Sequence, residues 1–213
     1  MNAQTLAAKI AVMLAMQDEM NSRVDRDWIA RGREWYRAVW IECAELMEHY
    51  GGWKWWKKTD GDREQAMLEI VDLWHFGLSM YIDAARDHAA AAERIADEWR
   101  APRVSGGFLA DVEALARVAL VERRFLVGAI PALLAALERD FDDLYRTYVG
   151  KNVLNFFRQD HGYKAGDYVK IWAGREDNAH LADLLSSLDS DAPDFRARLY
   201  AALRARYPQH PRR

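Results

Sequence analysis

Four carboxylates form two pairs with the same internal spacing. Glu42 and Glu45 are three residues apart, and so are Glu69 and Asp72. Both pairs lie in stretches with helical apolar periodicity, and side chains three apart on a helix share a face, with Cβ atoms roughly 5–6 Å apart. If the two helices pack side by side, the pairs face each other and form a site of oxygen ligands. Such a site suits Mg²⁺ or Mn²⁺ far better than Zn²⁺.

Cationic and amide side chains form a second group in the C-terminal half of the chain. Lys151, Asn155 and Arg158 stand at i, i+4 and i+7, which places them on one stripe of a helix. Five more lysines lie in two other segments: Lys54, Lys57, Lys58, Lys164 and Lys170. Carboxylates combined with Lys and Arg suit a metal-bridged polyphosphate, because the metals cancel charge repulsion and the cations bind the remaining phosphate oxygens.

Each pattern also has a purely structural explanation. An E-x-x-E spacing more often marks a solvated helix face than a ligand set, and Glu45 with Glu48 has the same spacing. His75 alone is more often a hydrogen-bonded structural histidine than a ligand. The tryptophans of segment 53–58 could form a core cluster or an oligomer contact. The functional interpretation therefore depends on the acidic and basic groups occurring together.

Helical periodicity runs through almost the whole chain and must position these groups. It predicts helices at 3–22, 33–49, 62–99, 108–124, 131–138, 140–161, 179–187 and 194–206. Gly51 and Gly52 mark a turn, residues 102–107 a break, and residues 163–178 lack helical period. Because there is no repeat or low-complexity linker, we expect an all-α, single-domain helical bundle over residues 1–213. A basic tail over about 207–213 is expected to be mobile.

Composition narrows the functional class. With 51% hydrophobic residues the chain can bury a large core, and its net charge of −3 gives no overall attraction to nucleic acid. The single cysteine, Cys43, excludes an internal disulfide. Charged residues such as Lys9 and Glu19 interrupt the apolar N-terminal stretch, which argues against a signal peptide or membrane span. We therefore expect a cytoplasmic protein that binds neither nucleic acid nor membrane.

A family resemblance is carried by segments that occur in order along the chain: 41–46, 53–58, 69–76, 148–159, 162–164 and 176–178. They resemble the dimeric dUTPases, an all-α family of the nucleoside triphosphate pyrophosphohydrolase superfamily that includes MazG-like proteins. The superfamily as a whole shares the acidic pairs. The sequences Lys-Asn-Val-Leu-Asn at 151–155 and Trp-Lys-Trp-Trp-Lys-Lys at 53–58 narrow the resemblance to dUTPase.

The resemblance implies a homodimeric dUTP diphosphatase that converts dUTP, and dUDP as well, to dUMP. By this likeness two or three Mg²⁺ ions are held by Glu42, Glu45, Glu69 and Asp72. The base is approached by Gln17 and Asn21, and Trp53 stacks on uracil, with Trp56 as a rival. Phosphate and nucleotide contacts fall to Lys151, Asn155 and Arg158. Further substrate contacts are assigned to Lys54, Lys57, His75, Lys164 and Asn178.

In the implied reaction a carboxylate of the first pair, Glu42 or Glu45, takes a proton from the water that attacks phosphorus in line; we favour Glu42. Two alternatives stay open at this point. One is a house-cleaning pyrophosphohydrolase for dCTP or modified nucleotides, and the other is a catalytically silent helical interaction module. Residues 86–130 are Ala-rich and shorter than the corresponding family insert, which leaves the substrate cap and any dimer contact there undefined.

Overall fold

The computed structural model describes residues 3–85, 87–189, 192 and 194–208. Within this part the chain is helical almost throughout, which confirms the predicted all-α class. The helices are α1 (Ala3–Val24), α2 (Trp35–Tyr50), α3 (Arg63–Ala85), α4 (His88–Arg100), α5 (Phe108–Glu122), α6 (Ile130–Ala136), α7 (Phe141–Asp160), α8 (Asp177–Ser187) and α9 (Phe195–Arg206), with short 3₁₀ turns η1 (Val127–Ala129) and η2 (Tyr163–Ala165). The two strands are β1 (Ile171–Trp172) and β2 (Arg175–Glu176).

The chain divides into two compact units, Met1–Tyr145 (unit 1) and Arg146–Arg213 (unit 2). The division falls within α7, whose first turn belongs to unit 1 and whose remainder belongs to unit 2. The expectation of one domain over residues 1–213 stays a prediction. Among the described residues no helix is both long and apolar enough to cross a lipid bilayer.

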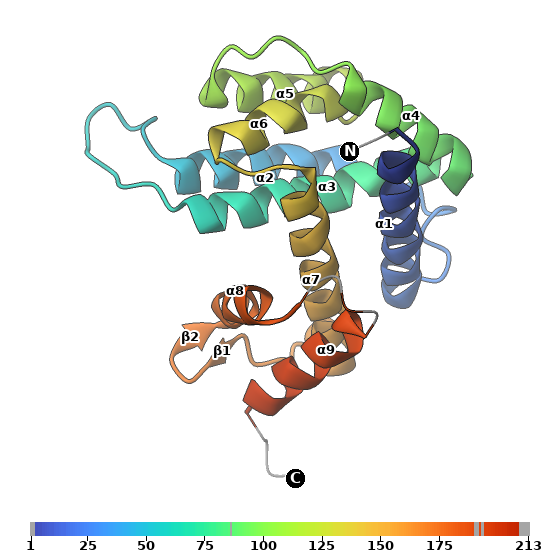
Figure 1. Cartoon of the computed structure of the whole chain (residues 1–213), viewed down its shortest axis with the longest axis vertical. Helices are drawn as coiled ribbons and strands as arrows, with labels where there is room; N and C mark the ends of the chain where they lie inside the picture. Colours follow the sequence, from blue (N-terminus) through green and yellow to red (C-terminus); the bar gives the residue numbers. More distant parts are fainter. Residues whose placement is uncertain (1–2, 86, 190–191, 193, 209–213) are drawn as a thin grey trace. The chain divides into compact units, whose positions relative to one another are not determined.

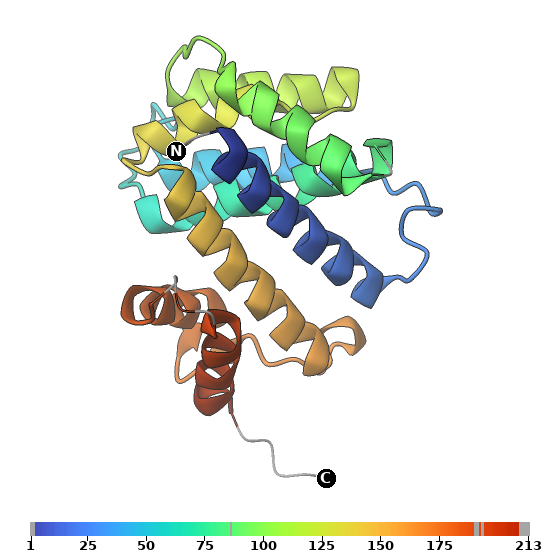
Figure 2. The ribbon, with the colours of Figure 1, turned by 45° about the vertical axis from the view of Figure 1, so that its right-hand side comes forward.

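Unit 1 is built around the pair α2 and α3, which lie side by side with α5 and α6 along them (Figure 1). The helix α1 packs against α3 and α4, and Figure 2 shows α1 and α4 next to each other. The apolar side chains of α3 point in most directions around its axis, and a helix that is apolar all round belongs in a core. Ile70, Val71, Trp74 and Leu78 are all buried, as their periodicity predicts.

A tight backbone contact closes the connection between α2 and α3. The amide of Asp62 donates to the carbonyl of His49 at 2.7 Å. A Cβ atom on Gly61 would lie 2.3 Å from the carbonyl oxygen of Tyr50, so only glycine fits at this approach. Gly51, with φ of +78°, ends α2. The connection therefore holds the C-terminal end of α2 against the N-terminal end of α3.

The prediction of one helix over 62–99 was wrong. The helix α3 ends at Ala85, and α4 begins at His88. Asp87 has extended backbone angles, and its side chain accepts a hydrogen bond from the amide of Ala89 at 2.9 Å, which is the geometry of an N-cap. This cap starts a new helix within a sequence whose alanines favour helix on both sides.

The ends of α7 lie within one residue of the predicted range 140–161. The side chain of Asp140 accepts hydrogen bonds from the amides of Asp142 at 2.9 Å and Asp143 at 3.0 Å, and so caps the helix. At the other end α7 stops at Asp160, just before Gly162 with its positive φ of +85°.

Unit 2 packs around two fully buried aromatic side chains, Phe157 of α7 and Trp172 of β1, whose ring centroids are 5.7 Å apart. The strands form an antiparallel pair with Ile171 opposite Glu176. The predicted interval without helical period ends two residues earlier than expected, since α8 begins at Asp177. At the start of the predicted mobile tail, the Tyr207 ring lies 5.2 Å from that of Phe157, whereas residues 209–213 lie outside the described residues.

Candidate functional site

The acidic pairs of α2 and α3 meet in unit 1. One carboxylate oxygen from each of Glu42, Glu69 and Asp72 lies within 4.8 Å of the other two. Glu69 is buried, and the other two side chains are half-buried. The spacing of three residues on α3 puts Glu69 and Asp72 on one face, and α2 brings Glu42 to them. This set of hard oxygen donors fits a divalent cation such as Mg²⁺.

Glu45, the fourth predicted ligand, lies outside this set of three. Its side chain is exposed on α2, one turn after Glu42. Its charge nevertheless acts on Glu42.

Burial and charge repulsion raise the pKa of Glu42 to about 9. Burial is the larger cause, followed by the negative charges of Asp72, Glu69 and Glu45 and by a hydrogen bond with Glu69. Carboxylates held this close cannot all ionise unless a cation compensates them. The electrostatics of the cluster therefore agree with its donor chemistry, because a bound divalent cation would offset the repulsion that, together with burial, keeps Glu42 protonated.

A histidine that the sequence analysis did not single out also reaches the cluster. The Nε2 atom of His49 lies 3.5 Å from Oε1 of Glu69. His49 stands seven residues after Glu42 and therefore lies on the same face of α2. That spacing was the signal available in the sequence.

A buried polar network joins α1 to α3. Gln17 Nε2 donates to Asn21 Oδ1 at 3.0 Å and to Ser79 Oγ at 3.1 Å, and Asn21 Nδ2 donates to Ser79 Oγ at 2.9 Å. His75 Nδ1 lies 2.6 Å from Gln17 Oε1, and Ser79 donates to the carbonyl of His75 at 3.0 Å. The two amides predicted to approach a base are thus held in fixed orientations. Ser79, which holds both, was missed by the sequence analysis.

The Trp-Lys segment 53–58 is anchored by Glu48. Trp53 Nε1 donates to Glu48 at 3.1 Å, and Lys54 forms an ion pair with the same carboxylate. The ammonium of Lys54 lies 5.1 Å from the centroid of the Trp53 ring. Trp53 is half-buried, whereas Trp56 is 58% exposed. Both rings stay candidates for stacking on a base, and the predicted contact residue Lys57 is exposed in the same segment.

The predicted cationic stripe lies on α7 within unit 2. Lys151 is buried, and Asn155 and Arg158 are half-buried. Lys164 follows on η2 and is exposed. Unit 2 also contains Asn178, in the first turn of α8.

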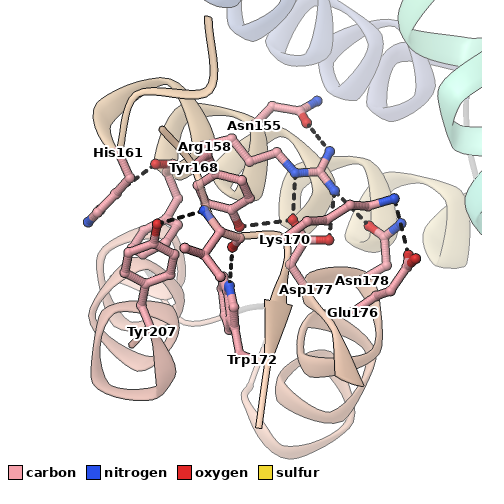
Figure 3. Close-up of polar contacts among 12 residues, drawn as sticks. Asn155, Arg158, His161, Tyr168, Lys170, Trp172, Glu176, Asp177, Asn178 and Tyr207 are labelled. Carbon is pink, nitrogen blue, oxygen red and sulfur yellow. Dashed lines mark hydrogen bonds and ion pairs between the residues drawn. The ribbon is translucent and has the colours of Figure 1, made fainter. Parts of the chain in front are cut away.

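Arg158 is the centre of a hydrogen-bonded network (Figure 3). Its Nε and Nη2 atoms donate to the two carboxylate oxygens of Asp177 at 2.8 Å and 2.9 Å. Nη1 donates to Asn155 Oδ1 at 3.1 Å, and Nη2 also donates to Asn178 Oδ1 at 3.3 Å. The hydroxyl of Tyr168 donates to Asp177 at 2.9 Å.

The side chain of Asp177 is fully buried. Burial by itself raises the pKa of this carboxyl, but the hydrogen bonds and charge of Arg158, with the hydroxyl of Tyr168, bring the pKa below its ordinary value. Asp177 is therefore ionised at neutral pH and holds Arg158 in place.

The predicted residues thus fall into two sets. The carboxylates, the amide network and the Trp-Lys segment belong to unit 1, and the Lys-Asn-Arg stripe with Lys164 and Asn178 belongs to unit 2. Convergence of the two sets on one nucleotide stays a prediction.

Comparison with known protein families identifies the chain. A family model described as dUTPase matches residues 9–163, well over half of the sequence. A comparison with curated proteins finds no match. The matched range contains both acidic pairs, the buried amide network and the α7 stripe, and the fold is all-α, as such a family requires. The chain therefore belongs to the all-α dUTPase family and is a nucleoside triphosphate pyrophosphohydrolase that acts on dUTP.

Proposed function

We propose that this dUTPase uses Mg²⁺, accepts dUDP as well as dUTP, and carries out its chemistry at the carboxylate cluster of α2 and α3. The observation that carries the proposal is the meeting of Glu42, Glu69 and Asp72 within 4.8 Å of one another. Membership of the dUTPase family supplies the activity and a general dependence on a divalent metal. The ion, the second substrate and the residue roles are the proposal.

The three clustered carboxylates would hold the cation, and Glu45 would complete the ligand set from its exposed position. The clustered donors are carboxylate oxygens, which favour Mg²⁺, with Mn²⁺ as a substitute. When bound, two or three such ions neutralise phosphate charge and polarise the phosphoryl group under attack. Phosphates would otherwise be repelled by this part of unit 1.

Glu42 is assigned as the proton acceptor for the attacking water. Its carboxylate belongs to the cluster itself, so it would lie beside the water that a bound cation activates. The water would attack the α-phosphorus in line with the leaving phosphate or pyrophosphate. Because this reaction requires that only the α and β phosphates be bound, dUDP should be a substrate as well.

The buried amide network is assigned to base recognition. Uracil presents carbonyl acceptors and an N–H donor, whereas cytosine replaces one carbonyl by an amino group and the N–H by an acceptor. Gln17 and Asn21 are held by Ser79 and His75, so they cannot rotate freely to suit the wrong base. A site with fixed polar groups rejects a base that leaves them unpaired. Trp53, or Trp56 beside it, would stack on the ring.

The remaining basic and amide residues are assigned to the nucleotide and its phosphates: Lys54, Lys57, Lys151, Asn155, Lys164 and Asn178.

We also propose that the protein is a homodimer, as the family resemblance implies. Sedimentation equilibrium would test this directly, and a monomer at micromolar concentration would contradict it.

The experiment that tests the proposed function measures pyrophosphate release from dUTP, dCTP and dTTP, and phosphate release from dUDP, with Mg²⁺, with Mn²⁺ and with a chelator. We expect turnover of dUTP and dUDP only with a divalent ion and at least about 10²-fold discrimination against dCTP. Equal turnover of dCTP would instead indicate a house-cleaning pyrophosphohydrolase. Inactivity toward every nucleotide would contradict the proposal.

Two variants then localise the chemistry. Glu69→Gln removes a ligand charge at the centre of the cluster and should lower kcat/KM for dUTP by more than about 100-fold. Glu113→Gln changes an exposed carboxylate on α5 and should leave activity unchanged. A catalytically silent interaction module would show no activity in any of these proteins.

A further inference from the structure

We propose that a cavity at one end of the α2–α3 pair is a second binding site, separate from the carboxylate cluster, and that it binds a small phosphate-bearing anion. The cavity lies within unit 1 and has a volume of about 330 Å³. A cavity of this volume is within the usual range of small-molecule sites in proteins. The inference does not depend on the proposed function, because none of its observations involves the carboxylate cluster.

The cavity lies at the end of the α2–α3 pair that is far from the connection 51–62. It is lined by the start of α2 and the loop before it, by the C-terminal end of α3, by α4 and by the segment after α5. Tyr36 precedes Glu42 by six residues and Met80 follows Asp72 by eight, which is a separation of roughly 9–12 Å along the helix axes. None of the described residues that line the cavity belongs to the carboxylate cluster or to the buried amide network.

The lining of the cavity is rich in positive charge. Four arginines contribute to it: Arg33, Arg94, Arg123 and Arg124. Two of them are paired with carboxylates outside the lining, Arg33 with Asp25 at 2.8 Å and Arg124 with Glu122 at 2.7 Å. The lining itself contains two carboxylates, those of Glu34 and Asp83, which offset only part of the charge of four arginines. Guanidinium groups gathered in one cavity attract an oxyanion, although the chain as a whole has a net charge of −3.

Two of the arginines, Arg94 and Arg123, lie over aromatic rings. The guanidinium carbon of Arg94 is 5.1 Å from the ring centroid of Tyr81, and that of Arg123 is 5.1 Å from the ring centroid of Tyr36. A guanidinium whose face is held by a ring keeps the N–H groups in its plane for an anion. Arg94 donates to Glu98 through Nε at 3.3 Å, which leaves its two Nη groups. Arg123 forms no ion pair with a carboxylate among the described residues.

The backbone at Arg123 supports a binding role for its side chain. Arg123 follows the last residue of α5 with φ of +51° and ψ of +41°, a left-handed conformation that glycine adopts far more readily than arginine. Strained residues of this kind are concentrated at binding and catalytic sites. An arginine at this position places a cation in the cavity despite the backbone strain.

A phosphoryl group matches the donors of the cavity. Its oxygens can accept hydrogen bonds from guanidinium groups on different elements, and here α4 supplies Arg94 while the segment after α5 supplies Arg123. A concave site of this size favours a small molecule over a segment of another protein. Pyrophosphate and a nucleoside monophosphate such as dUMP share this chemistry, so the experiment includes both.

Titration of the metal-free protein tests the site, because binding of phosphate at the carboxylate cluster needs a cation. Pyrophosphate, dUMP, citrate and a hexaglutamate peptide are titrated separately at constant ionic strength. Calorimetry measures each affinity, and the indole N–H resonance of Trp35, which lines the cavity, reports where the ligand binds. We expect saturable binding of pyrophosphate or dUMP with a shift of this resonance, and weaker binding of citrate and of the peptide. The tighter of the two phosphate compounds identifies the ligand as a nucleotide or as the free anion.

Arg123→Gly removes the cation without disturbing the backbone. Because glycine suits the left-handed conformation, the melting temperature of this variant should be equal to or above that of the unmodified protein. Its affinity for the phosphate compound should fall by about 10-fold or more, and Arg94→Met should have a similar effect. Arg117→Met is the matched control, since it removes an exposed arginine of α5 that does not line the cavity, and its affinity should be unchanged.

Three results would overturn the inference. The first is that neither pyrophosphate nor dUMP binds the metal-free protein, or that binding leaves the Trp35 resonance in place. The second is an affinity in Arg123→Gly equal to that of the unmodified protein. The third is that citrate or the peptide binds as tightly as the phosphate compounds, which would assign the cavity to carboxylates or to an acidic protein partner.

Discussion

At the scale of single residues, Glu42 shows how surroundings set the reactivity of a carboxylate. In the metal-free protein its pKa of about 9 means that it carries a proton at neutral pH. A divalent cation must displace this proton, so Mg²⁺ affinity should increase as pH rises toward 9, and binding at about pH 7 should release roughly one proton. Calorimetry in buffers of different ionisation enthalpy measures the number released.

The control for this prediction is Glu42→Gln, which has no proton to release. Mg²⁺ binding to the unmodified protein without proton release would contradict the protonated state of Glu42. Proton release by the unmodified protein and by Glu42→Gln should be compared up to about pH 9, because Glu42 loses its proton near that pH even without Mg²⁺.

Ser79 makes a second residue-scale prediction. Its hydroxyl oxygen accepts from both Gln17 and Asn21, so Ser79→Ala leaves two buried amides without a shared acceptor. The preference for dUTP over dCTP in kcat/KM should fall by about 10-fold. Competition between the two nucleotides in one assay measures it.

Ser186→Ala is the matched control, since Ser186 is exposed on α8 and donates to the carbonyl oxygen of Asp183 at 2.8 Å, within its own helix. Its selectivity should equal that of the unmodified protein. If Ser79→Ala kept the same preference for dUTP over dCTP, the amide network would have no role in base recognition.

At the scale of elements, the connection between α2 and α3 determines whether the acidic pairs meet. Gly61→Ala would place a methyl group 2.3 Å from the carbonyl oxygen of Tyr50, and the backbone contact at the helix ends would have to open. We expect a loss of about 1–3 kcal/mol in the free energy of unfolding. Mg²⁺ binding should weaken in parallel. Denaturant titration and calorimetry measure the two effects.

Gly106→Ala is the control variant, because the atom nearest to its new Cβ would be the Cβ of Ala110, at 3.3 Å. It should change stability much less. Equal losses for the two variants would show that the α2–α3 connection tolerates a side chain at residue 61.

Elements could be predicted from sequence where periodicity and caps coincide. The ends of α7, where Asp140 caps the helix and Gly162 follows it, were predicted to within one residue, and the buried stripe of α3 lies within a range predicted from helical periodicity. The break at Asp87 could not be read in this way, because the alanines beyond it favour helix and only one capping side chain interrupts them. His49 and Ser79 were missed for another reason: each acquires its role from contacts between helices, which single-helix spacing does not contain.

At the scale of the whole molecule, lowering the pH should change the stability of the two units in opposite directions. The pKa of Asp177 is below its ordinary value in the folded protein, so the stability that it gives unit 2 is present above about pH 4 and lost as pH falls through the folded pKa. The pKa of Glu42 is raised, so in the metal-free protein unit 1 gains stability as pH falls from about 9 toward 4.

Hydrogen exchange of the metal-free protein at about pH 3, pH 5 and pH 8 tests this contrast, because the Glu42 effect lies between about pH 4 and pH 9. Protection of α3 should increase from pH 8 to pH 5, and amides of α8 should lose protection at pH 3 before those of α3. In Asp177→Asn the pH dependence of α8 should largely disappear. Simultaneous loss of protection in both helices would contradict the opposite signs.

Contacts between residues far apart in the sequence were also the least predictable feature. Resemblance alone assigned Asn178, and no pattern pointed to the bond between Arg158 and Asp177, which are nineteen residues apart. A hairpin with two strands of two residues each lies between them in the chain, and strands this short leave no periodic signal.

The burial of Cys43 has a practical consequence. It is the only sulfhydryl group in the sequence, it is 2% exposed, and burial with the nearby charge of Glu42 raises its pKa to about 12. Maleimide dyes react with accessible thiolates and should therefore not label Cys43. A cysteine introduced on the surface of either unit would then be the sole attachment point for a fluorophore or spin label, with no need to remove the native one first.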